Sequence, residues 1–165
     1  MTIDLLKRFL QFCLFVLVQA LILNRILLFG CAMPLLYVYF VILFPRNYPK
    51  WGILLWSFAM GLSIDMFSNT PGIGSASLTL IGALQPLVLE LCLPREADEN
   101  LKPSLRTLGT NKFVFFAFTL TAIFCITFFT LEAFTFFNWL QWLQCIGGSL
   151  LLTLLLIITL ESIRK

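Results

Sequence analysis

The sequence predicts an all-α polytopic membrane protein, with six transmembrane helices in a single integral membrane domain that covers residues 1–165. Three observations predict this class. Hydrophobic residues make up 60% of the chain and charged residues only 12%, whereas about a quarter of the residues in a soluble domain are charged. The mean hydropathy is +0.98. Apolar runs near the length that crosses a bilayer, about 17–25 residues, recur along the chain.

The first expected helix covers residues 9–25 and follows a basic pair, Lys7 and Arg8. No small-residue cleavage site ends this run and further apolar segments follow, so we interpret it as an uncleaved membrane helix rather than a signal peptide. The second expected helix covers residues 28–44. Because proline is tolerated in the first turn of a helix, its regular part is expected to begin near Pro34.

Polar loops separate the remaining segments. A loop that contains two prolines, Pro45–Lys50, precedes the third segment. One long polar loop, residues 94–112, carries cations and carboxylates in near balance. It is either a solvated linker or a docking surface for a cytoplasmic partner. The last four expected helices cover residues 51–67, 74–93, 113–132 and 139–161.

The positions of lysine and arginine predict the orientation of the chain. With six spans and a cytoplasmic N-terminus, ten of the 11 basic residues lie on the cytoplasmic side and only Arg25 lies outside. Basic residues are enriched in cytoplasmic loops. Both termini and the loop 94–112 are therefore expected in the cytoplasm, and the turn that holds Asn69 on the outer side. The cytoplasmic residues are Lys7, Arg8, Arg46, Lys50, Arg95, Lys102, Arg106, Lys112, Arg164 and Lys165.

The composition argues against several function classes. The chain has no histidine, and its five cysteines are widely spaced without a Cys-x-x-Cys pair, so no metal or other cofactor is expected. Without histidine the commonest general base is missing, and no carboxylate pair or serine–lysine pair has a catalytic spacing. The chain is therefore expected not to be an enzyme. No basic run suggests nucleic acid as a partner.

One carboxylate, Asp65, lies inside the third apolar segment. A carboxylate at the centre of a membrane helix costs about 2.5–3.5 kcal/mol, so it usually faces protein or water. Gly61 lies four residues earlier on the same helix face, where it would let another helix approach closely. Small residues at the start of the fourth segment indicate the same close packing of helices: Gly72, Gly74 and Ala76.

Asp65 is expected near the outer end of its helix, in the same leaflet as Glu132 and Arg25. One interpretation of these charges is an outward-facing binding site, to which the turn residues Asn69 and Pro71 would belong. The other is an ion pair that locks helices together, or simple exposure at the interface. Within the chain, the candidate partners of Asp65 are Arg25, the small-residue start of the fourth segment and the Asn69 turn.

The chain carries the motif Gly61-Leu62-Ser63-Ile64-Asp65, followed by Pro71-Gly72 and the small residues that open the next segment. Together with other short stretches, in this order and spacing, it resembles the MreD family of rod shape-determining membrane proteins. The other stretches are Ile22-Leu23-Asn24, Leu28-Phe29-Gly30, Pro34 to Phe40, Phe67 to Gly72, Pro103-Ser104, Thr107-Leu108-Gly109 and Leu131 to Phe134.

This resemblance implies a non-catalytic scaffold of the cell-elongation machinery in the bacterial inner membrane. Such a scaffold binds the bitopic protein MreC and helps regulate peptidoglycan synthesis and cell shape, in a machinery that also holds MreB, RodA and a penicillin-binding transpeptidase. The resemblance also implies a six-helix fold similar to the substrate-binding subunits of energy-coupling-factor transporters, with a pocket that opens outward. The alternative function is a membrane subunit that binds a small molecule or a lipid, such as one of those transporter subunits.

Overall fold

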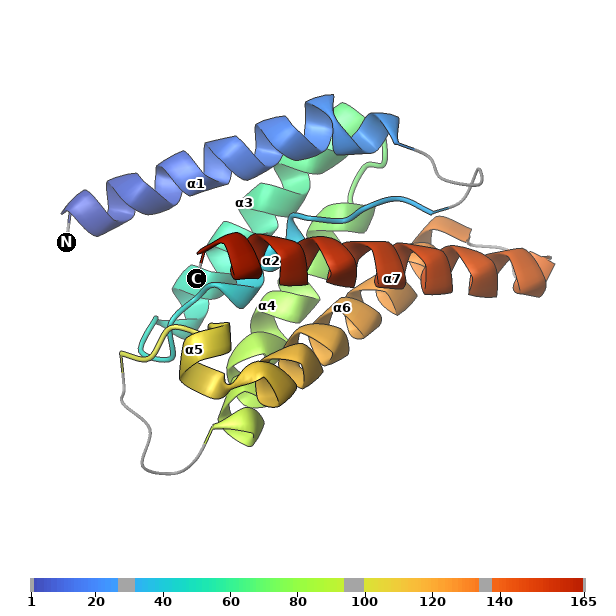
Figure 1. Ribbon diagram of the computed structural model, residues 1–165. Helices are drawn as coiled ribbons and strands as arrows, with labels where there is room; N and C mark the ends of the chain where they lie inside the picture. The colour runs from blue at the N-terminus through green and yellow to red at the C-terminus, as the bar shows by residue number, and fades with distance from the viewer. Residues whose placement is uncertain (1, 27–31, 94–99, 134–137, 165) are drawn as a thin grey trace.

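Five long helices dominate the computed structural model, which describes residues 2–26, 32–93, 100–133 and 138–164 (Figure 1). All five are long and apolar enough to cross a membrane. They are α1 (Thr2–Leu21), α3 (Lys50–Ser68), α4 (Ile73–Cys92), α6 (Thr110–Ala133) and α7 (Trp139–Arg164). Three short helices join them, namely η1 (Leu23–Arg25), α2 (Val38–Ile42) and α5 (Leu105–Leu108). The described residues thus form the helices of a membrane-embedded protein.

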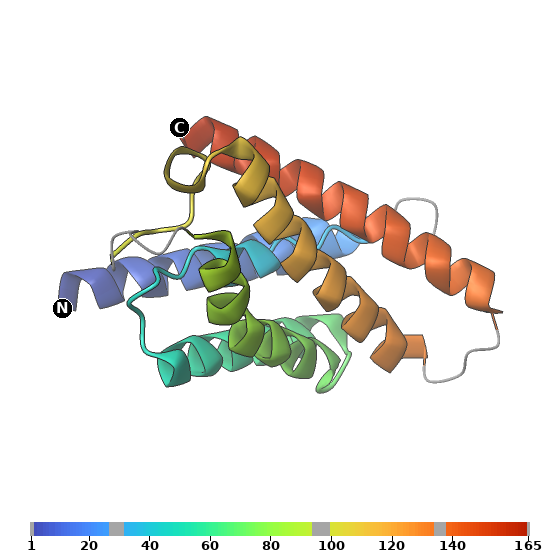
Figure 2. The same ribbon diagram turned by 90° about the horizontal axis from the view of Figure 1, so that it is seen from below.

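The long helices pack in chain order. The closest neighbours are α3 with α4, α4 with α6 and α6 with α7, while α1 lies against α3. Figure 2 shows α6 and α7 side by side, with α3 and α4 next to them. In both views the start of α1 and the end of α7 lie on the same side of the molecule. The helices α1 and α7 are the least buried, so most of their apolar surface is left for lipid or a partner.

The prediction of a helix over residues 28–44 is wrong. Residues 28–31 lie outside the described residues, residues 32–37 are not helical, and only the five residues of α2 form a helix. Pro34 explains part of the difference, because proline lacks an N–H and disfavours the helical conformation of the residue before it. Residues 34–42 are nevertheless all buried, so this segment runs through the interior of the helix bundle.

Side chains of the neighbouring helices satisfy the backbone of this buried segment. The amide of Gln19 on α1 donates to the carbonyl of Pro34 at 2.9 Å, and its oxygen accepts from the N–H of Leu36 at 3.1 Å. Gln85 on α4 donates to the carbonyl of Phe44 at 3.1 Å. Because an unpaired buried backbone group costs about as much as a lost hydrogen bond, glutamine inside an apolar helix is explained here by its backbone partners.

Hydroxyl groups on α7 accept hydrogen bonds from other backbone N–H groups of the same segment. Ser149 accepts from the N–H of Met33 and Thr153 from the N–H of Leu35, each at 3.1 Å. Both hydroxyl residues are fully buried. Non-helical backbone at membrane depth is tolerated only where protein or a water-filled cavity surrounds it. The structure meets this condition by enclosing the segment between α1, α4, α6 and α7.

The described part of the long loop expected over residues 94–112 contains a short helix and ends earlier than expected. Its first part, residues 94–99, lies outside the described residues. Ser104 then begins α5 with a capping box, in which its side chain accepts from the N–H of Thr107 and the side chain of Thr107 accepts from the N–H of Ser104. The next helix, α6, begins at Thr110, so the last three residues of the expected loop are already helical.

Candidate functional site: the Asp65 cavity

Asp65 caps the start of α4 from the neighbouring helix. Its Oδ1 accepts from the backbone N–H of Gly74 and its Oδ2 from that of Ser75, each at 2.9 Å. These are the second and third residues of α4, whose N–H groups have no partner within the helix. The residue in the capping position is Gly72, which has no side chain, so Asp65 supplies the cap instead. The hydroxyl of Thr70 also donates to Oδ1, at 3.1 Å.

The turn between α3 and α4 bends the chain back toward this carboxylate. Asn69 has a φ of +57° and Gly72 a φ of +87°, both in the left-handed region that favours asparagine and glycine. The N–H of Asn69 donates to the backbone carbonyl of Asp65, which closes the end of α3. The two left-handed residues therefore place the start of α4 against the end of α3.

Two glycines make this contact possible. A Cβ on Gly61 would lie 2.4 Å from the Cα of Ser75, and a Cβ on Gly74 would lie 2.5 Å from Oδ1 of Asp65. Both distances are far below van der Waals contact, so the helices could not approach this closely with any larger residue. The close approach expected beside Asp65 is therefore present in the structure.

The other two small residues differ from their expected packing role. Nothing lies within 4 Å of a Cβ placed on Gly72, whose role is its backbone conformation. Ala76 is exposed in the described part of the chain, so it is not buried in a helix contact. The interval of four residues from Gly72 to Ala76 indicated helix packing, but that face of α4 points away from the bundle.

A cavity of about 540 Å³ lies beside the α3–α4 turn; we call it the Asp65 cavity. Three residues expected from the sequence to share a site all line it: Arg25 from η1, Asp65 from α3 and Glu132 from α6. Its other lining residues are Ala20, Leu21, Asn24, Met33, Leu35, Tyr37, Ile64, Phe67, Ser68, Thr70 and Phe128.

These charges do not neutralise one another. Within the described part of the chain, neither Asp65 nor Glu132 forms an ion pair with Arg25. The carboxylate of Asp65 is 5% exposed and fully engaged by α4, whereas Arg25 and Glu132 are exposed. Of the three candidate partners of Asp65, the start of α4 is the main one, with Thr70 of the turn as a lesser one. The expectation that Arg25 could lock the helices through Asp65 is not met.

Two turn residues expected in a binding site lie outside the cavity. Asn69 and Pro71 are exposed on the turn but do not line the Asp65 cavity. A different asparagine, Asn24, does line it and donates to the hydroxyl of Ser68 at 2.7 Å, which ties η1 to the end of α3. Asn24 interrupts the first apolar run of the sequence. A polar residue at that position could have indicated the contact with Ser68.

Sequence reasoning missed a second buried carboxylate. Glu161 near the end of α7 is 3% exposed and accepts a hydrogen bond from the hydroxyl of Tyr39. Arg164 lies 4.0 Å from the same carboxylate. A glutamate and an arginine three residues apart in the last turn of an apolar helix could have indicated this cluster.

The helices and the Asp65 cavity define a class: a membrane-embedded helical protein with a cavity at the end of its bundle opposite the termini. No protein-family model, curated protein or solved structure matches the chain. Among the described residues, no group of three or more potential ligands could hold a metal ion.

Proposed function

We propose that the chain is a non-catalytic scaffold of the MreD family, which binds MreC in the bacterial inner membrane. Through MreC it would act within the elongation machinery that includes MreB, RodA and a penicillin-binding transpeptidase. The ordered motifs around Gly61, Asp65 and Pro71 support the family. The all-helical fold of the described residues is compatible with it.

The proposed topology has six crossings and both termini in the cytoplasm. Five crossings would be long helices, and the sixth would be the buried segment that includes α2, running between the end of η1 and the start of α3. The contact of Asn24 with Ser68 at one end of the bundle, and of Arg8 with Tyr48 at the other, supports this path. In a cysteine-free background, Asn69→Cys should react with an impermeant reagent added outside, whereas Lys102→Cys should not. The reverse labelling would contradict the orientation.

The observation that carries the scaffold function is the state of the charges in the Asp65 cavity. The deepest carboxylate, Asp65, is used to hold α3 to α4. The charges left for a partner, Arg25 and Glu132, are exposed at the rim. Small-molecule sites usually enclose most of their ligand, while polar rims are typical of protein–protein interfaces. An exposed pair of opposite charges therefore favours a protein partner.

The test is co-purification of MreC with the tagged chain after co-expression and mild solubilisation. Charge reversals at the rim, Arg25→Glu and Glu132→Lys, should each lower the retained MreC about tenfold, equivalent to about 1.4 kcal/mol. Two matched controls, Arg106→Glu and Glu90→Lys, change exposed charges away from the cavity and should retain it. No retention of MreC by the unsubstituted chain, or equal retention by the rim variants, would refute the proposal.

The alternative, a subunit that binds a small molecule or lipid, is favoured by one observation. Tyr37 lines the Asp65 cavity, and its hydroxyl has no hydrogen-bond partner among the described residues. With Arg25 and Glu132 it gives the cavity a hydroxyl, a cation and a carboxylate. Mass spectrometry of the purified chain distinguishes the two functions. A stoichiometric small molecule that is lost in Tyr37→Phe would favour the alternative.

A further inference from the structure

A second and larger cavity lies at the opposite end of the bundle, beside the two chain ends. It measures about 880 Å³ and is lined by four cations from three separate parts of the chain; we call it the basic cavity. Among the described residues, Asp4 is the one carboxylate that lines it. The cations are Lys7 and Arg8 on α1, Lys102 before α5, and Arg164 at the end of α7.

Aromatic rings, rather than a carboxylate, hold Arg8 at the cavity wall. Its guanidinium carbon lies 4.6 Å from the centre of the Phe44 ring and 4.5 Å from that of Tyr48. Both distances fall within the range of a cation–π contact. Such a contact fixes the position of the cation without neutralising its charge. The guanidinium N–H groups thus remain available to an anion.

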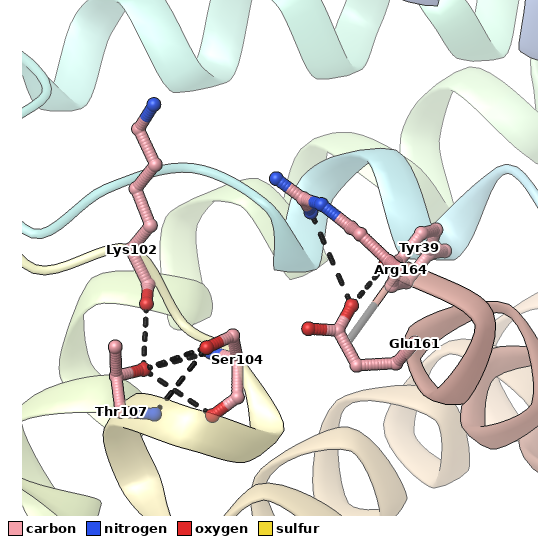
Figure 3. Close-up of polar contacts among 6 residues, drawn as sticks. All are labelled: Tyr39, Lys102, Ser104, Thr107, Glu161 and Arg164. Carbon is pink, nitrogen blue, oxygen red and sulfur yellow. Dashed lines mark hydrogen bonds and ion pairs between the residues drawn. The ribbon is translucent and has the colours of Figure 1, made fainter.

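Lys102 and Arg164 line the basic cavity as well, and Figure 3 shows both side chains with their polar contacts. The hydroxyl of Thr107 donates to the backbone carbonyl of Lys102 at 2.7 Å, which fixes this part of the loop. Arg164 shares the carboxylate of Glu161 with the hydroxyl of Tyr39. In Figure 3 the ammonium of Lys102 and the guanidinium of Arg164 extend toward the same side, away from the α5 turn.

The surroundings of the basic cavity indicate that its anion carries apolar chains. Leu6 and Leu10 stand beside Lys7 and Gln11 on α1 and are 68% and 72% exposed. With α1 spanning the bilayer, these leucines would contact acyl chains near the end of the helix, and the neighbouring cations would lie near the lipid head groups. Basic pockets at the ends of membrane helices are suited to anionic head groups. An amphiphile therefore fits this position better than a free ion does.

We propose that the basic cavity binds the phosphate group of an anionic phospholipid head group. Arg8 and Arg164 would donate hydrogen bonds to the phosphate oxygens, since the planar guanidinium matches phosphate geometry. Lys7 and Lys102 would add charge at the entrance. The site is separate from the Asp65 cavity and does not depend on MreC.

The experiment measures thermal unfolding of the purified chain, without MreC, in neutral detergent supplemented with one additive at a time. Phosphatidylglycerol at saturation should raise the Tm by about 5–10 °C. Phosphatidylcholine, which carries no net charge, and inorganic phosphate should each raise it much less. Native mass spectrometry should detect one phosphatidylglycerol retained per chain.

Matched double variants test the position of the site. Lys7→Gln with Lys102→Gln removes two exposed cations of the basic cavity and should markedly reduce both the shift and the retained lipid. Lys50→Gln with Lys112→Gln removes two exposed cations that do not line it and should keep both. Equal losses in the two double variants would overturn the proposal, because the effect would then follow total charge. An equal shift with inorganic phosphate, or none with phosphatidylglycerol, would also overturn it.

Discussion

Removing the carboxylate of Asp65 should destabilise the protein by about 2–4 kcal/mol. In Asp65→Ala the N–H groups of Gly74 and Ser75 lose their acceptors at 2.9 Å and stay in a buried position. Each unsatisfied buried group costs about 1–3 kcal/mol. The favourable interaction of the negative charge with the start of α4, worth about 0.3–2 kcal/mol, is lost as well. Water entering the Asp65 cavity would offset part of this sum.

A graded series separates these contributions. Asp65→Asn keeps one acceptor but loses the charge and one of the two backbone hydrogen bonds, so it should cost about 1–2 kcal/mol. Glu132→Ala removes a carboxylate from the same cavity that forms no hydrogen bond in the described structure. It should therefore change the stability by less than about 0.5 kcal/mol. The measurement is reversible unfolding in mixed micelles, followed by tryptophan fluorescence.

The same assay tests whether Arg25 is coupled to Asp65. Because the two form no ion pair, the effects of Asp65→Ala and Arg25→Ala should add within about 0.5 kcal/mol. Partial rescue of Asp65→Ala by Arg25→Ala would refute this reasoning and restore a direct pair. An Asp65→Ala variant as stable as the unsubstituted chain would refute the capping role itself.

Three further predictions concern packing and the buried segment. Gly61→Ala should destabilise the chain by about 1–3 kcal/mol through overpacking. The control is Gly147→Ala, where nothing lies within 4 Å of the added Cβ, and it should be neutral or stabilising. The measurement is the Tm of each variant. Gln19→Leu should cost about 2–4 kcal/mol because two buried backbone groups lose their partners, whereas the exposed Gln11→Leu should leave the unfolding free energy nearly unchanged. Tyr39→Phe should lower the Tm by several degrees, and an unchanged Tm would show that the buried carboxylate on α7 does not need this hydroxyl.

Apolar length predicted the helices α3, α4, α6 and α7 to within about three residues at each end, because a membrane helix needs a run of fixed minimum length. The helix expected over residues 9–25 instead covers Thr2–Leu21 as α1, because the polar residues Asp4, Lys7 and Arg8 at its start are helical too. The same criterion failed over residues 28–44. Burial in protein and contact with lipid both select apolar residues, so composition does not distinguish a lipid-facing helix from a buried irregular segment. Pro34 pointed to a late helix start, but nothing local indicated that Gln19 would satisfy the backbone beside it.

The candidate site was predictable to a similar extent. The interval of four residues between Gly61 and Asp65 located the close approach, because that interval fixes a shared helix face. It did not identify the partner. Arg25, the start of the fourth segment and the Asn69 turn all remained candidates, and the donors in the structure are N–H groups at the start of α4. Their position depends on the left-handed conformations of Asn69 and Gly72, which are visible only in three dimensions.

The buried segment has a consequence for the order in which the protein is assembled. The N–H groups of Met33 and Leu35 find their acceptors 116 and 118 residues later in the chain, on α7. At a synthesis rate of about 5–20 residues per second, those acceptors are made on the order of ten seconds later. Until then these two N–H groups lack the partners that they have in the folded protein. The segment is therefore expected to stay in water, at the membrane interface or bound to an insertion factor. The helix α7, which follows all the other described helices in the chain, is therefore the one that completes the interior.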